Sequence, residues 1–109
     1  MTPFNARVTM KPEAKRGEIV EIRTIARHPM ERGNYSDSSG RPVQRMIINR
    51  FTATHNGDEI FRMDLFPGIS ANPYIAFNTV ATETGDIVFE WLDDSGAKFT
   101  RTARLTVTG

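Results

Sequence analysis

The sequence contains no cysteine among its 109 residues. The chain can therefore form no disulfide bond, no thiolate nucleophile and no persulfide of its own. Any chemistry that needs a cysteine thiol would have to use a cysteine of another polypeptide.

Long hydrophobic runs and a strong charge of one sign are also missing. No apolar run approaches the ~20 residues that span a bilayer, so we expect no membrane insertion. Residues 1–7 lack the apolar segment of a secretory signal, which taken alone favours the cytoplasm. A net charge of +1 does not suit a nucleic-acid binder. With 39% hydrophobic and 25% charged residues, the composition predicts one globular domain over residues 1–109.

Lysine is scarce, whereas arginine is common. Of the 14 basic side chains, 11 are arginine and three are lysine. Arginine suits protein interfaces and the recognition of planar oxyanions, because its guanidinium group is a rigid, weakly hydrated fork. Genomic composition bias explains the ratio equally well, so both interpretations stay open.

Apolar and polar residues alternate along most of the chain, as in half-buried β-strands. The apolar series Phe99, Ala103 and Leu105 shows this pattern most clearly. The run around Trp91 has apolar residues on both faces, which favours a central strand. Broken alternation in two segments, 18–26 and 45–54, favours a bulge or a paired edge. We expect strands over residues 18–26, 45–54, 61–65, 74–80, 87–92 and 98–107.

Turn signals separate these runs. Asn56-Gly57 is the strongest, since this pair readily adopts the positive φ angles of a tight hairpin. Residues 93–96 predict a second hairpin and residues 83–86 a third. Short strands at close intervals predict an all-β fold, a single immunoglobulin-like β-sandwich of about seven strands. The expected core is Ile22, Phe51, Phe77, Phe89 and Trp91.

Residues 27–43 form a long, polar segment without periodicity. Loops longer than about 12–15 residues in a compact domain are usually functional or disordered. We interpret this segment as a long polar loop that is either functional or disordered.

Signatures of catalysis and of cofactor binding are missing. The sequence has no Gly-x-Ser-x-Gly elbow, phosphate loop or Gly-x-Gly-x-x-Gly motif. His28 and Glu31 could suggest a metal site, but Pro29 argues against the helix that would place them on one face. His55, the other histidine, falls within a predicted hairpin turn. We predict that the chain is not an enzyme and holds no metal or cofactor.

Four motifs occur in a fixed order. They are His28-Pro29-Met30-Glu31-x-Gly33, the basic-flanked apolar run 45–51, Asn72-Pro73-Tyr74, and Gly85…Trp91…Gly96. Their order and spacing, from about Ala6 to Val107, resemble the SoxZ family. SoxZ is the small subunit of the SoxYZ sulfur carrier of bacterial thiosulfate oxidation.

The resemblance implies an immunoglobulin-like sandwich that forms a heterodimer with SoxY. In that family a cysteine near the end of a flexible SoxY arm carries the sulfur intermediates, so this chain would be a non-catalytic scaffold. Other thiosulfate-oxidising Sox enzymes would contact the carrier transiently. The family works in the periplasm, which implies export of the pair on the signal peptide of SoxY.

Six residues are candidates for partner binding: His28, Met30, Glu31, Arg45, Phe66 and Tyr74. Phe66 is either a plug within its loop or an exposed anchor, and Asn72-Pro73-Tyr74 is either a strand entry or an interface. As a hypothesis, Arg32, Arg41 or Arg45 attracts the sulfonate end of an arm-bound thiosulfate. Alternatively, these arginines pair with carboxylates of SoxY.

Two other classes of protein remain open. One is a stand-alone immunoglobulin-like binding module. The other is a small enzyme or metal protein built around His28, Glu31 and His55.

Overall fold

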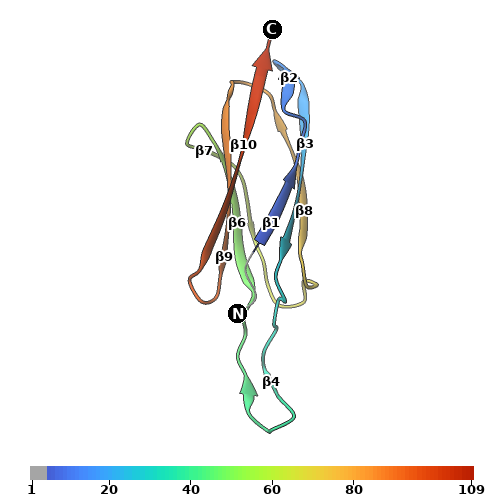
Figure 1. Cartoon of the computed structure of the whole chain (residues 1–109), viewed down its shortest axis with the longest axis vertical. Helices are drawn as coiled ribbons and strands as arrows, with labels where there is room; N and C mark the ends of the chain where they lie inside the picture. The colour runs from blue at the N-terminus through green and yellow to red at the C-terminus, as the bar shows by residue number, and fades with distance from the viewer. Residues whose placement is uncertain (1–4) are drawn as a thin grey trace.

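The structure is a computed structural model, and it describes residues 5–109. The first four residues of the N-terminal stretch considered for an export signal lie outside the described residues. Two β-sheets face each other, and a hairpin extends from one end (Figure 1). No helix capable of crossing a membrane occurs within residues 5–109.

The strands form three sheets. The three-stranded sheet has the order β1-β3-β8 and the five-stranded sheet has the order β2-β10-β9-β6-β7, while β4 pairs only with β5. The strands are β1 (Asn5–Thr9), β2 (Glu13–Lys15), β3 (Ile19–Arg27), β4 (Tyr35–Ser36), β5 (Pro42–Val43), β6 (Ile48–His55), β7 (Asp58–Asp64), β8 (Tyr74–Val80), β9 (Gly85–Asp93) and β10 (Lys98–Thr108).

These sheets confirm the predicted all-β, immunoglobulin-like sandwich. Seven of the ten strands contain five or more residues, and the other three contain two or three. β9 lies between β10 and β6, as its two apolar faces predicted. The short strands β1, β2, β4 and β5 were not expected from the sequence.

Aromatic side chains fill the space between the sheets. Phe51 lies at the centre, with its ring centroid 5.0 Å from that of Trp91. Phe61 of β7 stacks on Phe77 of β8 at 4.4 Å, which joins the two sheets. All five predicted core residues are buried (Ile22, Phe51, Phe77, Phe89 and Trp91). Each contributes roughly 1.5–3 kcal/mol by burial.

Two of the three predicted hairpins are confirmed. Asn56 and Gly57 have φ angles of 51° and 87° and connect β6 to β7. Residues 93–96 connect β9 to β10. The hairpin predicted at residues 83–86 is wrong, because β8 and β9 belong to different sheets. Gly85 instead permits close packing, since a Cβ there would collide with the side-chain amide of Asn56.

The two segments with broken alternation differ in cause. In β6 the register shifts between Ala53 and Thr54, which confirms the expected bulge. In β3 the burial alternates regularly, but Thr24 points inward while Ile19 and Ile25 point outward. The sequence pattern of β3 is therefore irregular because apolar residues lie on its outer face.

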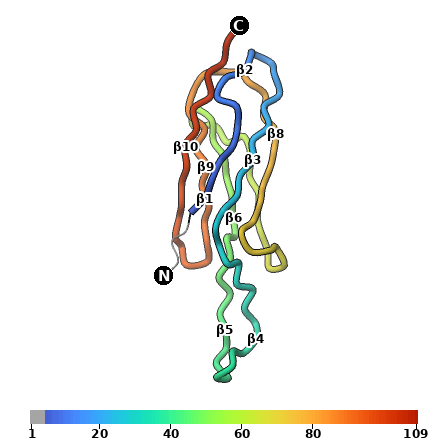
Figure 2. The backbone as a smooth tube through the Cα atoms, turned by 45° about the vertical axis from the view of Figure 1, so that its right-hand side comes forward, coloured from blue at the N-terminus to red at the C-terminus, as the bar shows by residue number. Residues whose placement is uncertain are grey.

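The long polar segment is not an irregular loop, which corrects the interpretation of residues 27–43. We call residues 31–46 the arm. It is a β-hairpin whose strands β4 and β5 pair Tyr35 with Val43. The arm projects beyond the sandwich (Figures 1 and 2), and the molecule measures 62 × 20 × 19 Å. The hairpin escaped prediction because its strands are two residues long and have no apolar face.

Candidate partner-binding site

His28 lies where β3 passes into the arm, and its side chain is only 6% exposed. Its Nδ1 accepts a hydrogen bond from the backbone N–H of Met30 at 3.0 Å. Its Nε2 lies 3.6 Å from Oδ2 of Asp93. Its backbone N–H donates to Oδ1 of Asn72 at 3.0 Å, and its carbonyl accepts from the N–H of Asn72 at 2.8 Å. His28 thus ties the start of the arm to the β9 end and to the loop before β8.

Met30 is buried beneath the arm, with 6% of its side chain exposed. Its φ angle is 52°, which is uncommon for a residue with a side chain. Its Sδ accepts a hydrogen bond from the backbone N–H of Ile48 at 3.3 Å. The positive φ angle directs the backbone out of the sandwich, while the Met30 side chain stays packed in the hydrophobic core.

Backbone pairing closes the base of the arm at Glu31 and Met46. The N–H of Glu31 donates to the carbonyl of Met46 at 2.8 Å, and the reverse bond measures 2.7 Å. Gly33 has a φ angle of 67°, and a Cβ there would collide with the backbone nitrogen of Arg45. Only glycine fits this position without displacement of the opposite strand.

The Glu31 carboxylate organises the inner half of the arm. It accepts from the backbone N–H of Gly33 at 3.0 Å and from the hydroxyl of Tyr35 at 2.7 Å. These two bonds, the first above all, lower the pKa of Glu31, and the carboxylate raises the pKa of Tyr35. The guanidinium of Arg32 lies 4.9 Å from the Tyr35 ring centroid, within the range of a cation–π contact.

Arg45 clamps the other side of the base. Its Nε and its terminal nitrogen each donate to one oxygen of Asp94 at 2.8 Å, a bidentate pair. Asp94 also accepts from the backbone N–H of Ile47 at 3.0 Å and from the Asn49 amide at 2.9 Å. The Arg45 guanidinium is the main cause that lowers the pKa of Asp94 to about 2. The clamp thus joins the arm to the β9–β10 turn.

Large apolar side chains are exposed around this base. Phe66, in the loop after β7, is 66% exposed, and Tyr74, at the start of β8, is 58% exposed. Ile25 lies opposite Tyr74 in the sheet register and is also exposed. A groove lined by residues of the arm and by Ile69 connects the arm with the 66–69 loop. We call the exposed side chains Ile25, Tyr35, Phe66, Ile69 and Tyr74 the arm-end patch.

The structure gathers all six candidate residues at one end of the sandwich but in three different environments. His28 and Met30 are buried and hold the base of the arm. Glu31 and Arg45 lie at its surface within polar networks. Phe66 and Tyr74 are exposed. Phe66 therefore does not plug its own loop, which was one of the two alternatives for this residue. A role in partner binding stays a prediction for all six.

Sequence reasoning missed three members of the arm-end patch: Ile25, Tyr35 and Ile69. The irregular alternation of β3 was the available signal for Ile25, since it placed an isoleucine on the polar face. Tyr35 and Ile69 lie in segments without periodicity, so their neighbours could not be predicted. Arg41 lies near the arm tip, where its backbone N–H donates to Asp37 at 3.0 Å.

The structure does not bring His28, Glu31 and His55 together. His28 contacts Asp93, which lies opposite Ile48, the first residue of β6. His55 is the last residue of β6, seven residues after Ile48 in a strand that rises about 3.4 Å per residue. Within residues 5–109 no three His, Cys, Asp or Glu side chains are grouped as a metal site requires.

The model of the family described as sulphur oxidation protein SoxZ matches residues 8–104. The chain belongs to the SoxZ family. This confirms the family resemblance inferred from the four motifs, over nearly the whole chain. No curated protein matches the sequence.

Solved structures similar to this SoxZ-family chain share its fold at low sequence identity. A superoxide reductase (neelaredoxin) from Ignicoccus hospitalis has a TM-score of 0.75 at 13% identity, covering 96% of this chain and 82% of that one. The sulfur carrier protein SoxY from Chlorobium limicola f thiosulfatophilum has a TM-score of 0.67 at 11% identity, covering 95% and 79%. A putative superoxide reductase from Thermotoga maritima has a TM-score of 0.71 at 13% identity, covering 95% and 86%. At these identities the likeness shows the fold alone.

Proposed function

We propose that this chain is the non-catalytic scaffold subunit of a heterodimeric sulfur carrier for thiosulfate oxidation. A SoxY-like partner would bear the cysteine that carries the sulfur. The observation that carries the proposal is the SoxZ family match over residues 8–104 in a chain without cysteine. A carrier subunit without a thiol leaves the covalent chemistry to its partner.

The arm-end patch supports a partner surface at one end of the sandwich. Exposed aromatic side chains such as Phe66 and Tyr74 commonly anchor interfaces, because they bury a large area at a small cost in side-chain entropy. Glu31 and Arg45 would form the polar rim of this surface. His28 and Met30 would act indirectly, by holding the arm at its angle.

The proposed place of work is the periplasm, with residues 1–109 acting as one domain. Export together with a signal-bearing partner would bring the chain there. Contacts with the other thiosulfate-oxidising Sox enzymes would be transient, since the carrier must leave each enzyme after its step.

Capture of the partner tests the proposal. The tagged chain is purified from a thiosulfate-grown source, and the co-purifying protein is weighed intact. We expect a stoichiometric small partner with a cysteine near its C-terminus and sulfur-sized mass additions. A lone, folded monomer or homodimer would reject the carrier function and favour a stand-alone binding module.

Matched variants locate the partner surface. Phe66→Ser and Tyr74→Ser should each weaken the heterodimer at least tenfold, since anchors of this kind contribute about 2 kcal/mol or more. Val80→Ser is the control, because Val80 is exposed at the opposite end of β8. Equal weakening by all three variants would place the partner elsewhere.

A further inference from the structure

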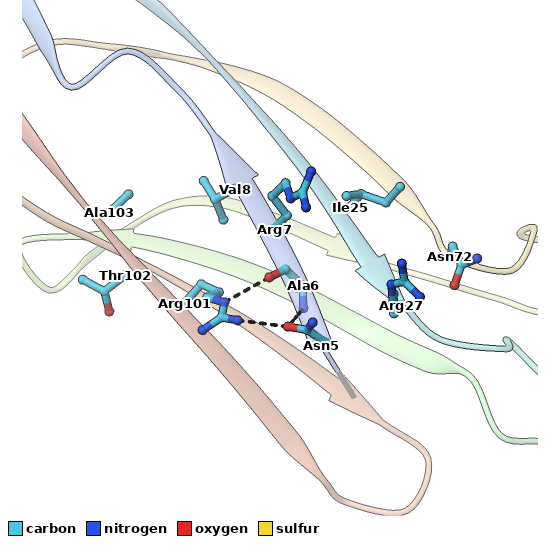
Figure 3. Close-up of a pocket in the computed structure, with 10 residues that line it drawn as sticks. All are labelled: Asn5, Ala6, Arg7, Val8, Ile25, Arg27, Asn72, Arg101, Thr102 and Ala103. Carbon is cyan, nitrogen blue, oxygen red and sulfur yellow. Dashed lines mark hydrogen bonds between the residues drawn. The ribbon is translucent and has the colours of Figure 1, made fainter. Parts of the chain in front are cut away.

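A groove of about 700 Å³ runs beside β1, between the sandwich edge and β10 (Figure 3). Three arginines line it: Arg7 of β1, Arg27 at the end of β3 and Arg101 of β10. The other described lining residues are apolar or neutral polar, and none is acidic. The groove therefore carries positive charge without a carboxylate on its walls.

Arg101 is fixed in place. Its Nε donates to the carbonyl of Ala6 at 3.0 Å, and its terminal nitrogen donates to Oδ1 of Asn5 at 2.9 Å (Figure 3). Its guanidinium lies 4.9 Å from the Phe99 ring centroid. These contacts use two of the five N–H donors of the guanidinium group, so the others remain for a ligand.

Arg7 and Arg27 lie on neighbouring strands and point to the same outer face. Arg27 is opposite Asn5, and Arg7 is opposite Ile25. The two arginines are therefore diagonal neighbours on paired strands, and residues placed in this way lie roughly 7–8 Å apart in the sheet. Neither side chain forms a hydrogen bond or an ion pair with any residue among 5–109.

Several other arginines of this chain are neutralised by a neighbouring carboxylate. These pairs are Arg23–Glu21, Arg45–Asp94, Arg50–Asp64, Arg62–Glu59 and Arg104–Asp86. The three groove arginines have no such carboxylate partner among the described residues, and they lie together, whereas Arg16, Arg32 and Arg41, which are also unpaired with a carboxylate, lie elsewhere. A rigid guanidinium fork recognises tetrahedral oxyanions by paired hydrogen bonds as well as by charge.

We propose that this groove binds the oxygen-rich end of a sulfur oxyanion, a sulfate, thiosulfate or sulfonate group. The choice of a sulfur anion among oxyanions rests on the proposed function. The anion is either free in solution or carried on a cysteine of the partner. The second source fits the location, because Ile25 lines the groove and also belongs to the arm-end patch.

The proposal also revises the search for a sulfonate-binding arginine. Arg45 already holds Asp94 through both oxygens, and Arg32 lies against Tyr35. Arg41 lies near the arm tip, away from the groove, whereas Arg7 and Arg27 line one groove together with Arg101. The groove arginines are therefore better placed to take an incoming anion together.

The test is an NMR titration of the full-length ¹⁵N-labelled chain at constant ionic strength. Thiosulfate represents the free anion and S-sulfocysteine the carried one, with sodium chloride as the balancing salt. We expect saturable shifts confined to residues 5–8, Arg27, Asn72 and residues 101–103. Shifts spread over all basic residues would overturn the proposal, as would none at tens of millimolar anion.

Double variants separate a built site from general charge. The R7Q/R27Q variant should bind the preferred anion at least tenfold more weakly, and R7K/R27K should fall between it and the natural chain. The R50Q/R62Q variant removes the same charge elsewhere and should change affinity less than twofold. Equal weakening by R7Q/R27Q and R50Q/R62Q would reject the groove as a specific site.

The two anions identify the source, and partner capture separates this inference from the proposed function. Tighter binding of S-sulfocysteine supports a carried anion, and tighter binding of thiosulfate supports a free one. If R7Q/R27Q retains the partner and loses anion binding, both proposals stand. If a partner is captured but the titration gives no anion-dependent shifts, only the groove proposal is overturned. If the groove binds the anion but no partner is captured, only the carrier function is overturned.

Discussion

The sandwich and the arm both contain antiparallel strand pairs, but different interactions stabilise them. The sandwich is stabilised by residues distant in sequence, such as Phe51, Phe77 and Trp91, whose buried rings pack against one another. The arm has no core, and polar contacts at its base fix it, among them those of Glu31 and Arg45. We therefore expect the part of the arm beyond its base to be changeable without loss of fold stability, and four variants test how far this separation holds.

The largest expected effect is on the core. Trp91→Ala should lower the free energy of unfolding by about 3–5 kcal/mol, since it removes a fully buried aromatic side chain. Urea unfolding followed by circular dichroism measures this loss. Phe66→Ala is the control and should change stability by less than about 0.5 kcal/mol. A small loss for Trp91→Ala would show that the core does not carry the fold.

Gly33→Ala should break the base of the arm. Left-handed backbone strain of about 1–2 kcal/mol adds to a collision with the strand that holds Arg45, for a total of about 2–4 kcal/mol. Gly40→Ala at the arm tip also has a positive φ, but nothing lies within 4 Å of its Cβ. It should lose only about 1–2 kcal/mol in the same denaturation measurement. Equal losses would contradict the close approach at Gly33.

Asp94→Asn should weaken the pairing with Arg45 and lower the free energy of unfolding by about 1–3 kcal/mol, as for the loss of hydrogen bonds to a charged group. The folded-state pKa of Asp94, about 2, lies below its ordinary value of 3.8. The stabilisation is therefore fully present above pH 4 and is lost as the pH falls towards 2.

A pH series of urea unfolding between pH 2 and pH 6 checks this prediction. The natural chain should lose more stability than Asp94→Asn on acidification. Asp64→Asn, which removes an exposed pair with Arg50, should lose less than about 1 kcal/mol at neutral pH. Parallel pH curves for the natural chain and Asp94→Asn would refute the clamp.

The smallest expected effect on stability comes from shortening the arm. Replacing residues 36–42 by Asn-Gly leaves the Tyr35–Val43 pair joined by a two-residue turn. Stability should change by less than about 1 kcal/mol, because the hydrogen bonds of Asp37 that order this segment are made with Ser39, Gly40 and Arg41, which are removed with it. Heterodimer formation should weaken, as measured by partner capture. A large loss of stability would show that the arm and the sandwich fold as one unit.

The fold could be predicted from the sequence wherever burial imposes a period of two. Phe99 and Leu105 of β10 and Trp91 of β9 all lie on the inward face, with polar residues between Phe99 and Leu105 facing outward. The turn at Asn56-Gly57 was equally readable, because few other pairs adopt its backbone angles. Gly85 misled the prediction, since a glycine needed for close packing looks in sequence like a glycine needed for a turn.

The site was predictable only in part. His28 and Glu31 attracted attention as a motif, but their contacts are with backbone groups and with residues far along the chain, such as Asp93. The arginine groove combines three separate strands, and no local pattern links Arg7 to Arg101. Such groupings depend on strand order and register, which the sequence does not spell out.

The arm is long and joins the sandwich only at its base. In a molecule 62 Å long and about 20 Å wide, a small rotation of the arm at its base therefore moves the tip over a much larger distance. Three features set the angle between the arm and the sandwich: the backbone pair of Glu31 and Met46, the buried Met30 side chain, and the Arg45–Asp94 ion pair. Substitutions at Met30 or Asp94 would therefore change the position of the tip without changing any residue of the tip itself.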